Sequence, residues 1–299
     1  MTAAGRAAWV ASLGFELDEF QVQALDAIDA GRSVLVAAPT GSGKTVVGEY
    51  AVDRAMTEGN KAFYTTPLKA LSNQKYGDLV RRYGPEQVGL LTGDNSINGD
   101  APVVVMTTEV LRNMIYARSG ALTGLRYVIL DEVHYLENAW RGPVWEEVII
   151  HSPPEVDLVC LSATVSNAED VADWLATVRG SAEAIIEERR PVELTHLYLI
   201  GDKSSQELLL LPTFVDGRPN PNAAALDSTV ARGAGARRRE RPRFFTPRRA
   251  EVVELLSEQG MLPGIYFIFS RAACDGRVEG GGVGVGTAVD EGGKQEQLL

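Results

Sequence analysis

Short apolar runs alternate with helical patterns from Asp18 to about residue 200. Continuous apolar runs are typical of strands covered on both faces of a parallel sheet, and apolar residues that recur every three or four positions are typical of helices packed on it. The alternation predicts a doubly wound α/β domain, in which ligands bind at the carboxyl ends of the strands. The predicted strands are 33–37, 61–65, 87–91, 102–106, 126–130, 157–161, 183–187 and 193–199, and the predicted helices are 18–30, 44–57, 68–81, 108–117, 143–151 and 167–177.

The pattern changes after residue 200. The next stretch is rich in Pro, Gly, Asn and Ala and then in Arg, which predicts a flexible linker or an inserted loop. A helical pattern at 248–259 and an apolar run at 264–270 then predict the start of a second α/β domain. The predicted boundaries are 1–200 for the first domain, 201–247 for the linker, 248–275 for the truncated start of the second domain and 276–299 for a disordered Gly-rich tail.

Composition limits the class of protein. The chain has 299 residues, 45% of them hydrophobic, which is enough for a core and one to two domains. Two cysteines make no disulfide framework and indicate a reducing, cytoplasmic location. The three histidines show no metal-ligand spacing, and no apolar run approaches the roughly 20 residues that cross a bilayer, so no membrane partner is expected. Nothing in the sequence indicates an oligomeric state.

Charge is distributed unevenly along the chain. The net charge of −11 argues against broad nonspecific binding of nucleic acid. Residues 231–250 nevertheless contain eight Arg and one Glu, a net charge of +7, so the rest of the chain carries −18. This Arg-rich run predicts a salt-sensitive phosphate contact, with a solvated loop as the alternative.

Residues 38–45 have the sequence Ala-Pro-Thr-Gly-Ser-Gly-Lys-Thr and lie between a predicted strand and a predicted helix. This arrangement binds nucleotide phosphates, because inward-turned backbone N–H groups and the helix N-terminus meet the negative charge. Lys44 is predicted to reach the β- and γ-phosphates, and the Thr45 hydroxyl to hold Mg²⁺. Ala38 stands where the usual pattern has its first glycine, so a chance glycine-rich turn is the alternative.

An acidic segment, Asp-Glu-Val-His at 131–134, follows the apolar run 127–130. Carboxylates at the end of a buried strand lie where open α/β sheets bind ligands. Asp131 is predicted to hold Mg²⁺ through water, and Glu132 to orient or deprotonate the attacking water. A lone Asp-Glu pair is more often a solvated turn, but its combination with a phosphate-binding loop favours the catalytic interpretation.

Further motifs follow in order along the chain. They are Thr-Pro-Leu-Lys-Ala at 66–70, Ser-Asn-Gln-Lys at 72–75, Leu-Thr-Gly-Asp at 91–94, Met-Thr-Thr-Glu at 106–109, Arg-Gly-Pro-Val-Trp-Glu-Glu at 141–147, Leu-Ser-Ala-Thr at 161–164 and Phe-Ile-Phe-Ser-Arg at 267–271. With these motifs, residues 15–275 strongly resemble superfamily 2 helicases, and most closely the superkiller and exosome-associated RNA helicase family in its actinobacterial form. The resemblance implies a RecA-like ATP-binding domain, ATP and Mg²⁺ as cofactors, and ATP-dependent RNA helicase activity.

The resemblance also implies site residues. Phe15 would pack on the adenine ring and Gln21 would hydrogen-bond its edge, although a helix start with a hydrophobic staple is the alternative. Single-stranded RNA, or RNA with a single-stranded 3′ tail, would be gripped through its phosphates, although each of these segments alone is more often a helix cap. The implied phosphate-loop residues are Thr40, Gly41, Ser42, Gly43, Lys44 and Thr45, and the implied strand-binding residues are Pro67, Lys69, Thr92, Gly93, Thr107 and Thr108.

A third set of residues would couple the two sites. The resemblance implies that Ser162 and Thr164 bond to the acidic segment, and that His134 joins this network rather than binding a metal. A turn at the end of a strand is the alternative. A nuclease complex is an implied partner. The Ser-Asn-Gln-Lys segment at 72–75 resembles the RNA-acting branch, which favours RNA over DNA.

The chain departs from the family in its second domain. The later motifs of that domain, including the arginines that reach the γ-phosphate, are not found, and the tail after Cys274 is expected to reflect a shifted reading frame or a truncated gene. The expectation is therefore retained binding of ATP·Mg²⁺, slow hydrolysis and no processive unwinding. A non-hydrolysing ATP- and RNA-binding fragment and a DNA helicase of a sister family remain the alternatives.

Overall fold

The computed structural model describes residues 2–163, 167–203, 205–222 and 244–268, together with two short paired strands, β14 (Ala288–Val289) and β15 (Gln295–Glu296). The chain forms two compact units, which divide between Pro191 and Val192. No helix in these ranges is both long and apolar enough to cross a membrane.

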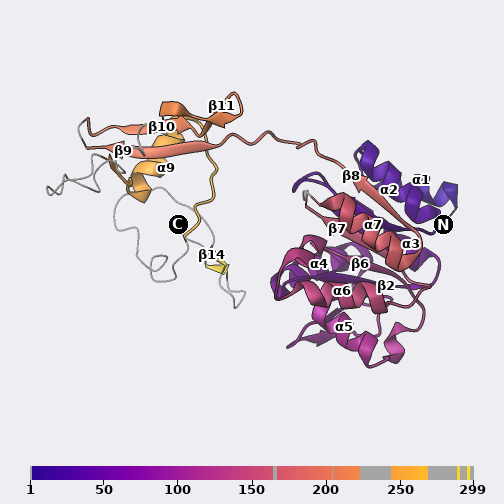
Figure 1. The fold of residues 1–299 in the computed structure, drawn as a ribbon. Helices are drawn as coiled ribbons and strands as arrows, with labels where there is room; N and C mark the ends of the chain where they lie inside the picture. The colour runs from indigo at the N-terminus through magenta and orange to yellow at the C-terminus, as the bar shows by residue number, and fades with distance from the viewer. Residues whose placement is uncertain are drawn as a thin grey trace. The chain divides into compact units, whose positions relative to one another are not determined.

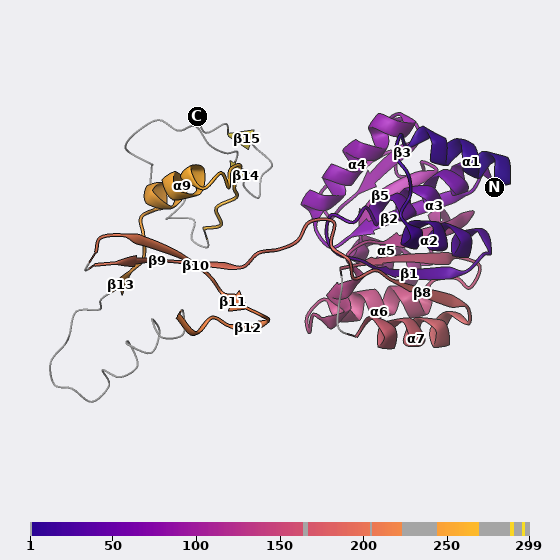
Figure 2. The same ribbon diagram turned by 90° about the horizontal axis from the view of Figure 1, so that it is seen from above.

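The first unit is built on an eight-stranded sheet with the order β4-β3-β5-β2-β6-β7-β1-β8 (Figures 1 and 2). Every neighbouring pair is parallel except β3 and β4. The predicted doubly wound, RecA-like α/β fold is therefore confirmed. The strands are β1 (Ser33–Ala37), β2 (Lys61–Thr66), β3 (Val88–Leu91), β4 (Ser96–Ile97), β5 (Val103–Thr107), β6 (Leu125–Leu130), β7 (Asp157–Ser162) and β8 (Ala182–Ile186).

Helices cover both faces of this sheet (Figures 1 and 2). Alternate residues of a strand point to opposite faces, so Val34 and Val36 belong to one apolar cluster and Leu35 to the other. The first cluster lies under α1 (Ala3–Ser12), α2 (Glu19–Asp29), α3 (Thr45–Thr57) and α4 (Lys69–Tyr83), and the second under α5 (Thr108–Tyr116), α6 (Gly142–His151) and α7 (Ala168–Arg179). Two short 3₁₀ helices, η1 (Gly120–Leu122) and η2 (Val133–Glu137), complete the unit.

Helix α1 lies outside the predicted elements, which begin at residue 18. The Thr2 hydroxyl caps it by accepting a hydrogen bond from the Gly5 N–H. Trp9 packs edge-on against Tyr50 of α3, with ring centroids 4.9 Å apart, and only 5% of Trp9 is exposed. The helix therefore belongs to the core through contacts with residues far along the chain.

The second unit contains a hairpin of β9 (Leu197–Asp202) and β10 (Leu208–Pro212), with β13 (Phe244–Phe245) on the other side of β9. Strands β11 (Phe214–Val215) and β12 (Arg218–Pro219) pair with each other, and α9 is Arg249–Glu258. β9 begins later than the predicted strand 193–199. Residues 264–268 of the predicted strand 264–270 form no strand, and residues 269–270 lie outside the described ranges. The predicted domain boundaries stay a prediction.

Candidate functional site

The sequence motifs meet at the carboxyl edge of the eight-stranded sheet. The phosphate loop follows β1, the acidic segment follows β6, and Ser162 ends β7. These three strands are neighbours, and we call this part of the edge the nucleotide half. Strands β3, β5 and β2 are neighbours in turn and end in the predicted strand-binding segments, and we call this part the strand half. The two halves meet between β2 and β6.

The phosphate loop is positioned by its glycines and by β7. Gly41 and Gly43 have φ of +87° and +83°, values that favour glycine. The Ala38 N–H donates to the carbonyl of Ser162 at 3.1 Å, which ties the start of the loop to the neighbouring strand. Lys44 is only 9% exposed, and its Nζ donates to the Ala38 carbonyl at 3.4 Å. The loop is therefore folded, with its lysine directed along it.

Gln21 supports this loop from the start of α2. Its Oε1 accepts from the Asp18 N–H at 2.9 Å, as in a capping box, and its Nε2 donates to the Gly43 carbonyl at 3.1 Å. A Cβ on Gly43 would lie 2.7 Å from that Nε2, so this contact also requires glycine. The helix-start interpretation of Gln21 thus describes the structure, and the adenine contact stays a prediction.

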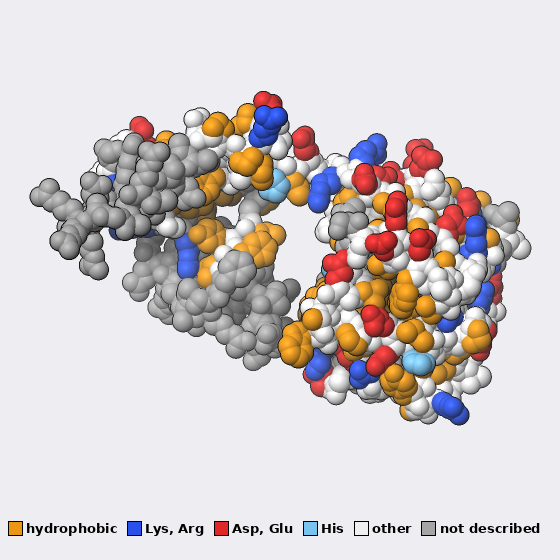
Figure 3. Space-filling view, viewed as in Figure 1, with side chains coloured by type: hydrophobic (Ala, Val, Ile, Leu, Met, Phe, Trp, Pro, Cys, Tyr) orange, Lys and Arg blue, Asp and Glu red, His pale blue; other side chains and the backbone are white. Residues whose placement is uncertain are grey.

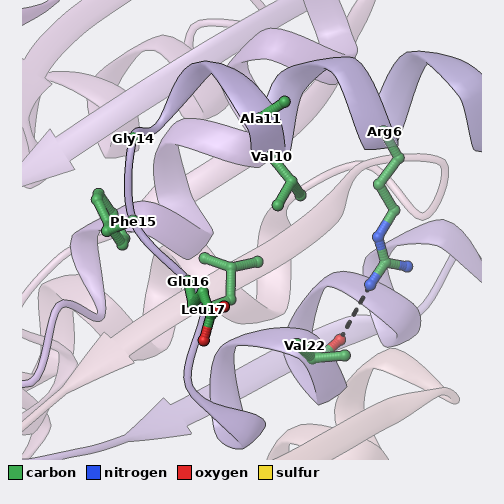
Figure 4. Close-up of a pocket in the computed structure, with 8 residues that line it drawn as sticks. All are labelled: Arg6, Val10, Ala11, Gly14, Phe15, Glu16, Leu17 and Val22. Atoms are coloured by element: carbon green, nitrogen blue, oxygen red, sulfur yellow. Dashed lines mark hydrogen bonds between the residues drawn. The ribbon is translucent and has the colours of Figure 1, made fainter.

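Phe15 lies in a different environment from Gln21. It is 53% exposed and lines an open cavity of about 510 Å³ between α1 and the start of α2. Figure 4 shows Phe15 on the loop between the helices, across the cavity from Arg6, whose guanidinium donates to the Val22 carbonyl at 3.4 Å. Gln21 does not line this cavity. The two predicted adenine contacts are close in sequence but are not brought into one pocket.

Asp131 is held at the end of β6 by groups from β2. Its backbone N–H donates to the Thr65 carbonyl at 3.0 Å, and its Oδ2 accepts from the Tyr64 hydroxyl at 3.1 Å. Burial raises the pKa of Asp131, and the Tyr64 hydroxyl, the Glu132 N–H and the ammonium groups of Lys75 and Lys44 oppose that rise. Burial also raises the pKa of Tyr64 well above its ordinary value. The Asp131 carboxylate is therefore oriented by a neutral hydroxyl donor.

Tyr64 is a site residue that sequence reasoning did not identify, and Lys75 lies in the Ser-Asn-Gln-Lys motif but was given no individual role. Lys75 of α4 lies 5.2 Å from the centre of the Tyr64 ring, and its Nζ is 3.6 Å from Glu49 Oε1. The only local feature that points to Tyr64 is its hydroxyl near the end of an apolar strand. Tyr64 reaches Asp131 because β2 is the neighbour of β6, and the sequence pattern does not reveal that strand order.

Glu132 has a left-handed backbone, with φ of 56° and ψ of 45°, directly before η2. This conformation is uncommon for a residue other than glycine and costs on the order of 1–3 kcal/mol, so the surrounding structure must maintain it. The Asp131 carboxylate does so in part by accepting from the Glu132 N–H at 3.0 Å. The Glu132 carboxylate lies 3.3 Å from Nδ1 of His134.

His134 and Ser162, two of the predicted coupling residues, line the same small cavity together with Asn167. Ser162 is 1% exposed, and its hydroxyl has no hydrogen-bond partner within the described part of the chain. The bond predicted between Ser162 and the acidic segment is therefore not formed there. Thr164, the third predicted coupling residue, lies outside the described residues.

The strand half combines exposed and buried groups. Lys69 is 55% exposed, and its Nζ is 3.1 Å from Asp94, which is 65% exposed. Asp94 also accepts from the Thr92 hydroxyl at 2.9 Å, beside exposed Gly93. Thr108 has no exposed surface, and its hydroxyl donates to the Thr66 carbonyl at 3.4 Å.

Pro67 is also buried, and Thr107 is 7% exposed. Thr107 precedes the first residue of α5, and its side chain caps no backbone N–H. The face of the unit seen in Figure 3 mixes acidic, basic and apolar side chains, with no single basic field.

The nucleotide half suits a magnesium–nucleotide complex. Mg²⁺ is usually held by one or two carboxylates and by substrate phosphates, so a single carboxylate and a hydroxyl suffice here. Asp131 and Thr45 are the residues predicted to supply those groups, and the buried Ser42 hydroxyl has no partner among the described residues. The same residues contain no cluster of three or more His, Cys, Asp or Glu that could hold a metal by themselves.

The family model for DEAD/DEAH box helicases matches residues 18–171, which include both the phosphate loop and the acidic segment. The chain belongs to this family. It is 51% identical over 280 residues to "Probable helicase HelY" of Mycobacterium tuberculosis, covering 90% of this chain and 31% of the relative. It is 40% identical over 309 residues to the "DExH-box ATP-dependent RNA helicase DExH15 chloroplastic" of Arabidopsis thaliana, covering 89% and 26%.

A further relative is "Superkiller complex protein 2" of Mus musculus, with 39% identity over 282 residues, 89% of this chain and 22% of the relative. The predicted resemblance is thereby confirmed. A solved structure of the Mycobacterium smegmatis helicase Lhr, bound to single-stranded DNA and AMP-PNP, matches with 29% identity and a TM-score of 0.50 over 59% of this chain and 27% of that one. The chain thus spans about a third or less of the length of these proteins.

Proposed function

We propose that this chain is the ATP-binding part of an ATP-dependent RNA helicase. The observation that carries the proposal is the order of motifs along one sheet edge, where the nucleotide half and the strand half are adjacent. A change at the γ-phosphate can then reach a bound strand across the β2–β6 boundary. We place this activity in the cytoplasm, as the cysteine usage indicates.

In the nucleotide half, each group has an assigned task. The backbone N–H groups of residues 40–43 and the ammonium of Lys44 would bind the phosphates of ATP, with Phe15 and Gln21 as proposed adenine contacts. Thr45 and Asp131 would hold Mg²⁺, which neutralises phosphate charge when bound. Glu132 would orient the attacking water and accept its proton.

In the strand half, the contacts would be with phosphates and independent of base sequence. Lys69 supplies a charge, Thr92 and Gly93 supply exposed groups beside it, and Pro67 shapes the turn into α4. Since the side chains of Thr107 and Thr108 are buried, we propose that they contribute through the N-terminus of α5, whose first N–H groups lack partners within the helix. His134, Ser162 and Thr164 would couple the two halves.

RNA is the proposed strand, either single-stranded or with a single-stranded 3′ tail. The name of the Arabidopsis relative supports RNA, and the name of the mouse relative supports assembly in a complex, for which we propose a nuclease partner. A DNA helicase is the second candidate, because the Lhr structure holds single-stranded DNA.

The decisive experiment is steady-state ATP hydrolysis by the purified chain with no strand, with single-stranded RNA and with DNA of the same sequence. We expect RNA to stimulate turnover more than DNA, and Lys44→Ala to abolish the stimulation. Equal or stronger stimulation by DNA would favour the second candidate. ATP binding without turnover on any strand would instead indicate a non-hydrolysing ATP- and RNA-binding module.

A further inference from the structure

Trp140 has the most exposed large apolar side chain among the described residues, at 93%. Trp145, five positions later, has no exposed surface and stacks on Tyr135 with ring centroids 5.6 Å apart. Exposed tryptophans are uncommon because the indole gains much from burial. Folding of this unit therefore uses Trp145 and leaves the indole of Trp140 in solvent.

The turn that carries Trp140 is closely specified. Asn138 Oδ1 accepts from the backbone N–H groups of Trp140 and Arg141, each at 3.0 Å, and the Asn138 carbonyl accepts from the Gly142 N–H at 2.7 Å. A Cβ on Gly142 would lie 2.3 Å from the Leu136 carbonyl oxygen, so only glycine fits there. The backbone of Trp140 is thus fixed although its side chain is free.

This turn is joined to the strand half. It follows β6 in the chain, but Arg141 Nη1 donates to the Pro67 carbonyl at 2.9 Å, directly after β2. The Arg141 guanidinium is also 6.0 Å from the centre of the Tyr135 ring, so two contacts position this group. The exposed indole is therefore one residue from a contact with the segment that leads to Lys69.

The chemistry of the strand half lacks one component that Trp140 supplies. Its ammonium, hydroxyl and N–H groups suit phosphates, and none offers an aromatic face to a base. Nucleobases stack on aromatic side chains whatever their sequence, because each has a π-face. The residues next to Trp140 in the turn are Asn138, Ala139 and Arg141, and none of them has a large apolar side chain.

We propose that Trp140 is a stacking platform for a nucleobase of the single strand held by the strand half. This inference rests on the proposed strand binding and adds a base contact to its phosphate contacts. It would hold one base beside the β2–β6 boundary, where the strand comes nearest to the nucleotide half.

The test compares Trp140→Ala and Trp140→Phe with the wild-type 299-residue chain. The probes are a fluorescent single-stranded oligouridylate and an abasic strand with the same number of phosphates, and the readout is anisotropy over a range of salt concentrations. The control is Tyr116→Ala, which removes a 54% exposed aromatic residue from the far end of α5. Thermal unfolding and ATP binding check that each variant folds.

We expect Trp140→Ala to weaken binding of the normal strand by about 5- to 150-fold and Trp140→Phe by less. Affinity for the abasic strand and the salt dependence should not change, because the indole has no charge. Unchanged affinity for the normal strand, or equal losses on both strands, would overturn the stacking proposal while leaving strand binding intact. If the wild type binds neither probe at low salt, the proposed function fails as well.

Discussion

The two halves of the carboxyl edge differ in how their polar groups are engaged before any ligand binds. In the nucleotide half, Lys44, Asp131 and Gln21 are largely buried and are held by hydrogen bonds to nearby strands and loops. In the strand half, Lys69 and Asp94 form an exposed pair, and exposed pairs contribute little to stability. One half is preorganised, and the other presents adaptable surface groups.

This difference fits the chemistry that each half would perform. Phosphoryl transfer depends on positioning and on fixed charges, so small displacements of a catalytic group are costly. A motor must grip a strand and release it, which surface contacts with phosphates allow. If this comparison is right, substitutions in the nucleotide half should change turnover steeply, and substitutions in the strand half should change affinity gradually.

The largest effect is expected from Glu132→Gln. Loss of the proposed base should lower ATP turnover by about 10²- to 10⁴-fold, with ATP affinity retained because Lys44 and the loop remain. Glu137→Gln, at the end of the 3₁₀ helix that Glu132 precedes and with an exposed side chain, is the matched control. Turnover measured by phosphate release checks this, and similar losses in both variants would contradict the assignment of the base.

Lys69→Ala should weaken strand binding by several-fold and lower the slope of log affinity against log salt by about 0.7, as expected for one phosphate contact on a single strand. ATP turnover without a strand should not change. The control is Lys61→Ala at the opposite end of β2, where the ammonium donates to the Ala121 carbonyl. A salt slope that stays at the wild-type value would show that Lys69 does not meet a phosphate.

Tyr64→Phe tests the preorganisation of Asp131. The hydroxyl favours the charged carboxylate, so its loss should raise the pKa of Asp131 further and move the acid limb of ATP turnover to higher pH. A group whose pKa is higher in the folded state than in the unfolded state stabilises the protein at low pH. This contribution is lost as the pH rises through the folded-state pKa. The ligand-free variant should therefore lose stability at neutral pH, by about 1 kcal/mol including the lost hydrogen bond.

Tyr83→Phe is the matched control for this variant, because its hydroxyl also donates to a carboxylate, Asp53, at 3.5 Å. The acid limb of ATP turnover in Tyr83→Phe should match that of the wild type. Urea unfolding and pH profiles of turnover give the two readouts, and an acid limb in Tyr64→Phe that does not move would show that the hydroxyl does not tune Asp131.

The smallest effect is expected from Thr108→Val. The hydroxyl donates to the Thr66 carbonyl inside the protein, so its loss should cost about 1 kcal/mol of stability and leave strand affinity unchanged. Thr92→Val, whose hydroxyl bonds to exposed Asp94, should instead weaken strand binding. A fall in strand affinity for folded Thr108→Val would mean that its side chain meets the strand directly.

The first unit was largely predictable from local patterns. Strand β1 has the predicted bounds. The other strands predicted between residues 61 and 187 differ from the observed strands by a residue or two, because apolar runs and turn residues are local features of the sequence. Helix α1 was not predicted, since its place depends on Trp9 packing against Tyr50. Residues 264–268 of the predicted strand 264–270 form no strand, because an apolar run does not by itself specify the neighbouring strand that a sheet requires.

Residue types and motifs along the chain predict its chemistry: which residues can bind phosphates, which carboxylates follow a strand, and which family the chain resembles. The folded arrangement of strands then brings particular groups into contact. Tyr64 reaches Asp131 across 67 residues, and Arg141 reaches Pro67 across 74, only because β2 and β6 are neighbours in the sheet. Strand order arises from packing and pairing of the whole domain, so the local hydrophobic pattern does not predict it.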